Sequence, residues 1–420
     1  MSCNPCESPR LLHNIQDMEL LITGIGQLVT PQARGPELAI HESCYIKIRD
    51  DEIVEFGPLA EAPPCDRVLE ARGGVVIPGL VDPHTHAVFA GTREEEFLRR
   101  CRGEPYSGGG ILATVAAVRQ AGEEELYQIG KRFLLEMLRS GTTTVEVKSG
   151  YGLDSENELK LLRVINKLNE DLPLDIVPTF LGAHAVPEGK SSAEYVEEVL
   201  AMIPEITDGA KPLAEFCDVF CEPGFFSVEE SRKILAACKG AALKLKLHAD
   251  ELQYSGGAEL AAELGAVSAD HLLKISDEGI QRLRQAGVIP VLLPGTAFTL
   301  NADYAPAWRA TRKMLDAGLP VALATDFNPG TCLIHSMLFI IALAVIKMGL
   351  TVEEALLAAT RNGAWALDLK DRGLIAPGML ADLVILALDN YRQIPYFIGH
   401  DLVRYVLKRG EVVYANPRLC

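Results

Sequence analysis

The chain has 420 residues, 48% of them hydrophobic, and a formal net charge of −17 at pH 7. Surfaces that bind nucleic acid or anionic membranes are basic, so this charge argues against both kinds of partner. The length exceeds one ordinary domain and fits a large barrel with a smaller companion.

No segment is predicted to direct the chain into or across a membrane. The first ten residues, MSCNPCESPR, are polar and lack the apolar stretch of a signal peptide. The most apolar run, Met337–Ile346, is too short to span a bilayer and is interpreted as a buried helix. Ten cysteines are scattered without the spacing of a disulfide framework, which suits reduced thiols and a cytoplasmic location.

The first predicted elements are two segments of alternating polarity, Glu19–Val29 and Tyr45–Phe56. Asp50-Asp51 lies inside the second segment and suits a hairpin turn. A single hairpin is marginally stable in water, so these strands need partners from elsewhere in the chain.

The middle of the chain alternates short β-branched runs with helical patterns, which is typical of βα units and a parallel sheet. Eight strands are predicted: Val75–Val81, Thr142–Val147, Asp175–Leu181, Phe216–Phe220, Lys244–Leu247, Val267–Ala269, Val288–Leu293 and Val321–Ala324. The helical segments between them include Glu123–Arg139, Glu156–Asn169, Ala193–Ile203 and Val228–Ala237. Eight such units close a (β/α)₈ barrel. The alternative, an open doubly wound sheet, would usually carry a glycine-rich nucleotide loop after its first strand, and the sequence has none.

The last predicted strands, Asp382–Leu388 and Arg404–Tyr414, alternate in polarity like the first two, with a turn at Arg409-Gly410. The two chain ends can therefore supply each other's strand partners. We predict an N-terminal tail (1–17), a composite β-sandwich domain (18–72 plus 370–420) and a (β/α)₈ barrel domain (73–369).

Polar side chains gather at the predicted ends of the barrel strands. Five of the nine histidines lie there (His84, His86, His184, His248 and His271), and Asp326 ends the eighth strand. Because the C-terminal ends of barrel strands meet at one mouth, these side chains are expected to converge. Residues two apart in an extended segment face the same side, so His84 and His86 can point inward together. With His248 and Asp326 they form a nitrogen and oxygen set that suits one zinc or iron ion and leaves a position for water.

Longer motifs run through the chain in the order HTHAVFAGTREEEF, EVKSGYGLD, TFLGAHAVP, CEPGFFS, LHADEL, SADHLL and TDFNPGTC. In this order they resemble the imidazolonepropionase family of the amidohydrolase superfamily. Many binuclear members of the superfamily carry a lysine on the fourth strand, but Phe216–Phe220 contains none, and Lys148 follows the second strand. This departure favours one divalent metal ion per chain.

The resemblance implies a role for each site residue. The metal ligands are His84, His86, His248 and Asp326, and the candidates for proton transfer are His271, Glu251 and Asp326. Substrate contacts are implied for Arg93, Tyr151, His184, Glu251, Asn328, Gly330 and Thr331. The planar fork of Arg93 suits a carboxylate, and the turn at 328–331 precedes a helix, where backbone N–H groups can face an anion. Only Ser107 separates Tyr106 from Gly108-Gly109-Gly110 in this sequence, whereas the family usually has a longer stretch there. The three glycines are interpreted as a flexible active-site loop.

The activity implied by the resemblance is hydrolysis of 4-imidazolone-5-propanoate to N-formimidoyl-L-glutamate, in histidine degradation, by a metal-activated water. The expected partner is this small molecule, and the family also implies a homodimer. Two alternatives stay open. Another mononuclear amidohydrolase, such as a purine or pyrimidine deaminase or another cyclic-amide hydrolase, would share the metal ligands but would not need Arg93. A catalytically inactive scaffold would not need a complete set of metal ligands.

Overall fold

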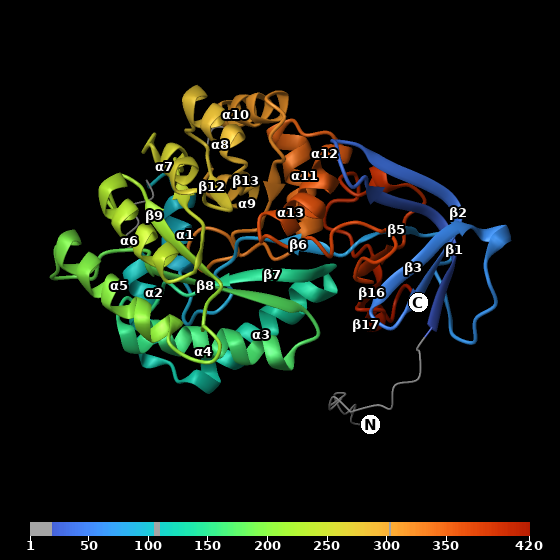
Figure 1. Ribbon diagram of the computed structural model, residues 1–420, viewed down its shortest axis with the longest axis horizontal. Helices are drawn as coiled ribbons and strands as arrows, with labels where there is room; N and C mark the ends of the chain where they lie inside the picture. Colours follow the sequence, from blue (N-terminus) through green and yellow to red (C-terminus); the bar gives the residue numbers. More distant parts are fainter. Residues whose placement is uncertain (1–18, 105–109, 302–303) are drawn as a thin grey trace.

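The molecule combines a parallel sheet surrounded by helices with a separate mixed sheet (Figure 1). The computed structural model describes residues 19–104, 110–301 and 304–420. The predicted tail 1–17, together with Tyr106 and Gly108-Gly109, lies outside the described residues. None of the helices in the described ranges combines the length and the apolar character needed to cross a membrane.

The parallel sheet places its strands in chain order around a barrel. They are β6 (Leu80–Asp82), β7 (Thr142–Lys148), β8 (Asp175–Ala183), β9 (Phe216–Cys221), β10 (Lys244–Leu245), β11 (His248–Ala249), β12 (Ser268–His271), β13 (Ile289–Leu292) and β14 (Ala322–Leu323). β10 and β11 share the fifth position, because both pair with β9. The barrel closes just beyond its first and last strands, where the His86 N–H donates to the Phe327 carbonyl at 2.8 Å and the Asp326 N–H to the His84 carbonyl at 3.0 Å. The predicted (β/α)₈ barrel is confirmed.

Helices cover the outside of the barrel (Figure 1). They are α1 (Glu94–Cys101), α2 (Gly110–Gln120), α3 (Glu123–Arg139), α4 (Ser155–Asp171), α5 (Ser192–Thr207), α6 (Val228–Gly240), α7 (Gly257–Leu264), α8 (Asp277–Ala286), α9 (Pro294–Thr299), α10 (Tyr304–Asp316), α11 (Met337–Met348), α12 (Val352–Ala359) and α13 (Arg361–Trp365). Capping boxes at Ser191 and Ser227 satisfy the first backbone N–H groups of α5 and α6. Most of α11 is buried, as predicted for the apolar run that it contains.

Both ends of the described chain build the mixed sheet, as predicted. Its strands are β1 (Glu19–Pro31), β2 (Leu38–Arg49), β3 (Glu52–Pro58), β4 (Val68–Glu70), β5 (Val75–Pro78), β15 (Leu383–Leu386), β16 (Val403–Lys408) and β17 (Glu411–Ala415), with short 3-10 turns at Leu59–Glu61 and Tyr391–Gln393. Both predicted two-residue turns are present, and positive φ angles of 49° and 75° at Arg409 and Gly410 suit the twist of a tight hairpin. The Ala381 N–H donates to the Asp51 carbonyl at 2.8 Å, so the sheet folds back on itself around a core that includes Ile46 and Ile385.

One predicted strand is divided between the two sheets. Val75–Val81 is predicted as the first barrel strand, but only β6 joins the barrel, and β5 pairs with β1 and β15 in the mixed sheet. Gly79 stands at the crossing, where a Cβ would lie 2.2 Å from the Thr143 Oγ1. A continuous apolar run cannot show where the chain changes sheets, because its residues are buried in both.

A charged cluster, which we call the junction cluster, joins the mixed sheet to the barrel through Asp175, Arg372, Asp382 and Lys408. The Lys408 Nζ lies 2.9 Å from the Asp175 Oδ2 and 2.6 Å from the Asp382 Oδ2, and Arg372 also donates to Asp175. Burial acts to raise the pKa of Asp175, but the charges of Lys408 and Arg372 outweigh it and bring this pKa to about 2. The cluster lies at the start of β8, at the end of the barrel opposite the strand-end histidines.

Candidate metal centre

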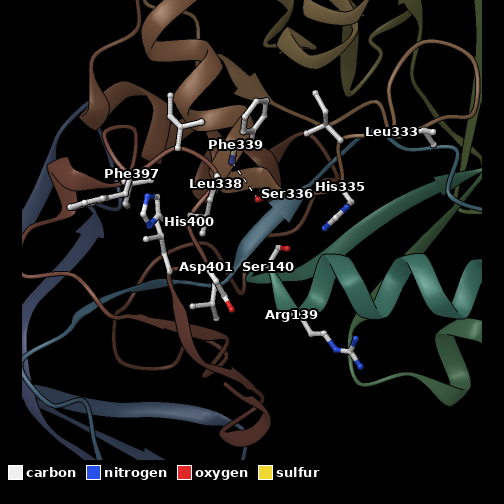
Figure 2. Close-up of a pocket in the computed structure, with 16 residues that line it drawn as sticks. Arg139, Ser140, Leu333, His335, Ser336, Leu338, Phe339, Phe397, His400 and Asp401 are labelled. Atoms are coloured by element: carbon white, nitrogen blue, oxygen red, sulfur yellow. Dashed lines mark hydrogen bonds between the residues drawn. The ribbon is translucent and has the colours of Figure 1, made fainter. Parts of the chain in front are cut away.

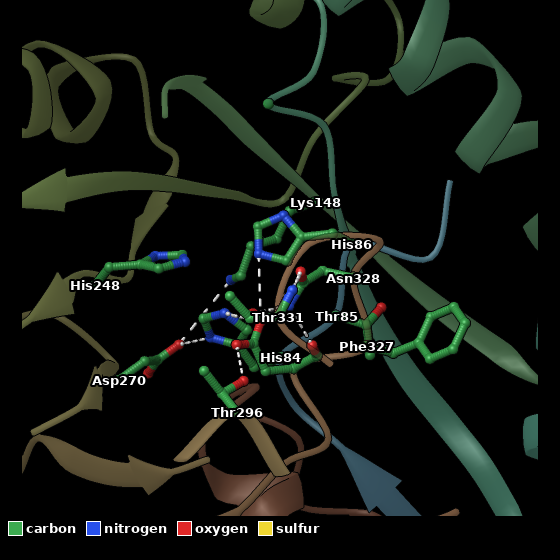
Figure 3. Close-up of polar contacts among 12 residues, drawn as sticks. His84, Thr85, His86, Lys148, His248, Asp270, Thr296, Phe327, Asn328 and Thr331 are labelled. Carbon is green, nitrogen blue, oxygen red and sulfur yellow. Dashed lines mark hydrogen bonds and ion pairs between the residues drawn. The ribbon is translucent and has the colours of Figure 1, made fainter. Parts of the chain in front are cut away.

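Two histidines and one carboxylate converge where the barrel closes. The Nε2 atoms of His84 and His86, both labelled in Figure 3, lie 3.5 and 3.6 Å from the Asp326 Oδ1. Asp326 has a φ of 51°, in the left-handed region that aspartate tolerates better than most residues. Its second oxygen accepts a hydrogen bond from the Thr296 hydroxyl. All three side chains are buried.

The spacing of these donor atoms fits a shared cation. Ligand atoms about 2.1 Å from a cation at tetrahedral angles lie roughly 3.4 Å apart, close to the observed separations. Hydrogen bonds between such atoms are shorter. The His84 Nε2 is buried and has no hydrogen-bond partner among the described residues, which is rare for a buried polar atom. The residues present therefore fit a divalent metal ion.

His248 and His271 approach the same position from the next strands. Donor atoms of His84, His248 and His271 lie within 4.8 Å of one another, as do those of His84, His86 and Asp326. The His271 Nδ1 lies 3.5 Å from the Glu251 Oε1, and the φ of 76° at His271 is also left-handed. His84 belongs to both groups, so the predicted ligands and proton carriers surround one centre.

Burial favours the neutral form of the histidines. It is the main cause that lowers the pKa of His84, His86 and His271 well below the ordinary value. The His84 Nδ1 lies 2.6 Å from the Asp270 Oδ2. An ionised carboxylate can only accept a hydrogen bond, so Nδ1 must donate, and the Nε2 lone pair faces the centre.

Tyr151 and His184 form the wall beside His86. The His184 ring stacks on the His86 ring with centroids 5.0 Å apart, and its Nδ1 donates to the Gly150 carbonyl at 2.9 Å. Burial is the main cause that lowers the pKa of His184 to about 3. The Glu158 carboxylate accepts the N–H groups of residues 150, 152 and 153, which fixes the loop that carries Tyr151.

Arg93, directly before α1, is engaged by Glu96. The Arg93 Nε donates to the Glu96 Oε2 at 2.9 Å, and its Nη2 donates to both carboxylate oxygens at 2.9 and 2.7 Å. Arg100 donates to the same carboxylate at 3.1 Å and to the Gly330 carbonyl at 2.7 Å. A Cβ on Gly330 would lie 2.2 Å from the Arg93 Nη1, so glycine lets the guanidinium pack against this turn.

The turn at residues 328–331 does not offer the backbone donors that its sequence suggests. The N–H groups of Gly330 and Thr331 donate to the Asn328 Oδ1 at 2.9 and 2.7 Å. The Asn328 side-chain amide donates in turn to the Asp326 carbonyl at 2.7 Å. The expected anion site is therefore replaced by a closed turn that supports Asp326 and Arg93.

The predicted residues line a narrow cavity of about 40 Å³. Its walls are His86, Arg93, Ile111, Tyr151, His184, Phe220, His248, Glu251, His271, Asp326, Asn328 and Thr331. A water molecule needs roughly 10–15 Å³ of such space, so the cavity has room for a few waters. Two predicted residues lie outside the wall, namely His84, which is fully buried, and Gly330, which contacts Arg93.

A larger cavity of about 460 Å³ lies elsewhere, between the end of α3, the segment before α11 and residues 394–403 (Figure 2). It contains His335, His400 and Asp401 on a largely apolar wall. The groups of described residues able to hold a metal include none of its side chains. Of these two cavities, only the smaller is lined by such metal-capable groups of the described residues.

The sequence did not identify the charged residues around the centre. Lys148, Asp218 and Asp270 are fully buried among the metal-facing histidines, and Ile111 and Phe220 complete the wall. Glu146 and Lys148, two apart in β7, point to the same side, and this alternation of charged residues with valines at the end of the strand was the available signal.

Comparisons with known proteins agree with this geometry. A model of the amidohydrolase family matches residues 108–414. The imidazolonepropionase of Haloarcula marismortui is 48% identical to this chain, and the match covers 94% of this chain and 96% of that protein. The imidazolonepropionase of Geobacillus kaustophilus is also 48% identical, with 95% and 97% covered.

Solved structures with lower identity share the fold. A triazine hydrolase variant superposes with a TM-score of 0.73 at 19% identity and covers 95% of each chain. An adenosine deaminase from Xanthomonas campestris with bound zinc gives 0.73 at 21% identity, over 96% of this chain and 94% of that one. These likenesses support the barrel and its companion sheet.

Proposed function

The chain belongs to the imidazolonepropionase family of amidohydrolases, and from this premise we propose that the barrel-mouth centre hydrolyses the cyclic amide of 4-imidazolone-5-propanoate. The product is N-formimidoyl-L-glutamate, formed in histidine degradation. The observation that carries the proposal is the convergence of the His84, His86 and Asp326 donor atoms at the edge of a buried cavity that Arg93 also lines.

One divalent cation, zinc or iron, is proposed at the centre, with His84, His86, His248 and Asp326 as its ligands. The donor-atom distances to Asp326 and the unpartnered His84 Nε2 support this assignment. When bound, the cation supplies an electrophile for the ring carbonyl and a water that ionises at about pH 7. Elemental analysis is expected to give about one metal per chain, and two tightly held metals that are both needed for activity would contradict it.

His271 and Glu251 are proposed to move protons during ring opening. The water oxygen bonds to the ring carbonyl carbon, the C–N bond breaks, and a proton must reach the leaving nitrogen. His271 and Glu251 lie 3.5 Å apart and line the cavity together. Burial raises the pKa of Glu251, and the charges of Asp326 and Glu222 add to this, so its carboxyl is suited to carry a proton. Asp326 is the alternative acceptor of the water proton, and pH–rate profiles of Glu251→Gln separate the two roles.

Arg93 is proposed to bind the propionate carboxylate of the substrate. The chain carries a net charge of −17, so an anionic substrate needs a local cation. Glu96 holds the Nε and Nη2 of Arg93, so the incoming carboxylate has to share or displace this contact. A purine or pyrimidine deaminase would not need this cation, which is why ring opening of an imidazolone with an acidic tail is favoured.

The test is a ring-opening assay with purified protein and freshly made imidazolone propanoate. We expect loss of the imidazolone absorbance and formation of N-formimidoyl-L-glutamate, with slower turnover of other cyclic amides, purines and pyrimidines. His271→Ala serves as the control for contaminating activity. Faster ammonia release from a purine than ring opening of the imidazolone would overturn the proposal.

A cytoplasmic location and a homodimer complete the proposal. The described cysteines form no disulfide, and several are fully buried thiols. Cell fractionation tests the location, and light scattering of the purified protein tests the dimer.

A further inference from the structure

Lys148 is a fully buried charge near the proposed metal centre. Its side chain has no exposed surface, and its Nζ lies 2.6 Å from the Glu146 Oε1, 2.8 Å from the Asp218 Oδ2 and 4.0 Å from the Asp270 Oδ2. Burial alone would lower the pKa of Lys148, but the charges of these carboxylates outweigh it, so the pKa lies above its ordinary value. Lys148 is therefore a permanent ammonium group inside the barrel.

The carboxylates around Lys148 contact two of the proposed ligands. The Asp270 Oδ2 lies 2.6 Å from the His84 Nδ1, and dashed lines join both Lys148 and His84 to Asp270 (Figure 3). The Asp218 Oδ2 lies 3.1 Å from the His248 Nδ1, and its Oδ1 accepts the His248 backbone N–H at 3.1 Å. One ammonium group is thus linked, through one carboxylate each, to a histidine that follows β6 and to a histidine in β11.

We propose that Lys148 is a positioning residue of the metal centre, which holds Asp218 and Asp270 so that His248 and His84 present their Nε2 atoms to the cation. This inference rests on the proposed metal ligands. Without the ammonium group, Glu146, Asp218 and Asp270 would be three buried carboxyls with less positive charge among them. Like charges that share a buried site repel one another, and displacement of Asp218 or Asp270 would release the histidine that it contacts.

Lys148 also explains why a third group of metal-capable residues need not hold an ion. Donor atoms of His84, Asp218 and Asp270 lie within 4.8 Å of one another. Both carboxylates of this group already face the Lys148 ammonium. The lysine side chain supplies there the positive charge that a second cation would otherwise bring.

Two other buried lysines provide matched controls. Lys246 contacts the Ser268 hydroxyl at 2.8 Å and lies 3.7 Å from the Asp270 Oδ2, so it approaches only one of the two carboxylates. Lys408, in the junction cluster, lies between two carboxylates as Lys148 does, but at the opposite end of the barrel. Replacing each lysine by methionine removes one positive charge and shortens the side chain by the same amount in all three variants.

The experiment measures Zn²⁺ affinity by chelator competition and the visible absorption of the Co²⁺-loaded full chain, both without substrate. Lys148→Met is expected to weaken Zn²⁺ binding by about 10- to 100-fold, the range found for residues that orient metal ligands, and to change the Co²⁺ spectrum. Lys408→Met is expected to lower the unfolding temperature while keeping the affinity within about threefold, because distant sites act independently. The Zn²⁺ affinity of Lys246→Met is expected to lie between those of Lys148→Met and Lys408→Met.

Wild-type affinity and an unchanged Co²⁺ spectrum in Lys148→Met would overturn the proposal, as would an equal loss in Lys408→Met. If Lys148→Met does not fold, the double variant Glu146→Gln/Lys148→Met removes one charge of each sign and is judged by the same two measurements, with Glu146→Gln as its control. Failure of the ring-opening assay would leave these metal-binding results unaffected. The two proposals can therefore fail separately.

Discussion

Lys148 and Lys408 are both buried ammonium groups, each held by two close carboxylates. Lys148 lies 2.6 and 2.8 Å from Glu146 and Asp218, whose side chains have no exposed surface. Lys408 lies 2.6 and 2.9 Å from Asp382 and Asp175, and the Asp175 side chain is 29% exposed. The partners of Lys148 continue to the metal-facing histidines, whereas those of Lys408 join the mixed sheet to the barrel. The same ion-pair chemistry therefore fastens two sheets at one end of the barrel, and at the other end we propose that it positions the metal ligands.

The largest effect, a loss of turnover, is expected for a residue at the mouth of the barrel. His271→Ala should retain the metal, because the proposed ligands do not include His271, but lose turnover by roughly 10²- to 10⁴-fold if His271 transfers a proton. Measuring kcat together with the metal content checks this prediction. A variant that arrives without metal would make His271 a ligand.

The next largest effect is expected for Arg93, and it separates substrate binding from metal binding at the mouth of the barrel. Arg93→Ala is expected to lower kcat/KM by roughly 10- to 150-fold, because hydrogen bonds to charged groups contribute about 1.5–3 kcal/mol. Lysine at this position should restore part of the loss, since it keeps the charge without the planar fork. An imidazolone with a neutral tail is the control. If Arg93→Ala slows both substrates by the same factor, Arg93 supports the loop and does not bind the carboxylate.

At the junction, the expected effect is on stability. Asp175→Asn should cost about 2 kcal/mol at pH 7, because the Asp175 pKa falls from 3.8 to about 2 and each pKa unit corresponds to about 1.4 kcal/mol. A lowered pKa stabilises the fold above the ordinary pKa, and this contribution is lost as the pH falls toward 2. The difference between wild type and variant in urea unfolding should therefore shrink between pH 5 and about pH 2. A difference that does not depend on pH would contradict the ion-pair explanation.

The smallest effect is expected for a residue outside both the barrel mouth and the junction cluster. Gly287 ends α8 with a φ of 73°, and a Cβ there would meet nothing within 4 Å. Gly287→Ala is expected to cost about 1 kcal/mol of stability from the left-handed backbone alone. Metal affinity and kcat/KM should remain at wild-type values. A change in metal affinity or in kcat/KM would show that any loss of stability affects the site at the barrel mouth. The different effects expected for the Lys148 and Lys408 variants would then not separate ligand positioning from stability.

Much of the fold could be predicted because it depends on local patterns. The helix α3 was predicted to the residue, since its apolar face and its flanking glycines are all local. Strand limits were less accurate: the fifth strand is broken at residues 246–247, and His248 and His271 lie inside strands that were predicted to end before them. Short strands are delimited by pairing with distant segments, which the sequence does not display. The domain boundaries at residues 72 and 370 stay a prediction that limited proteolysis can test.

The sequence pattern by itself determined the barrel, the pairing of both chain ends in a second sheet, and the convergence of the strand-end histidines and Asp326 at the mouth. These predictions follow from the alternation of polar and apolar residues, from the number of predicted strands and from the rule that the C-terminal ends of barrel strands converge. Only the tertiary structure decided that Val75–Pro78 leaves the barrel, that Glu96 holds Arg93, and that Lys148 faces Asp218 and Asp270 from another strand. Buried charges acquire their roles from the partners that fold around them, because an ammonium group in a medium of low dielectric is governed by the nearest carboxylates, wherever these lie in the sequence.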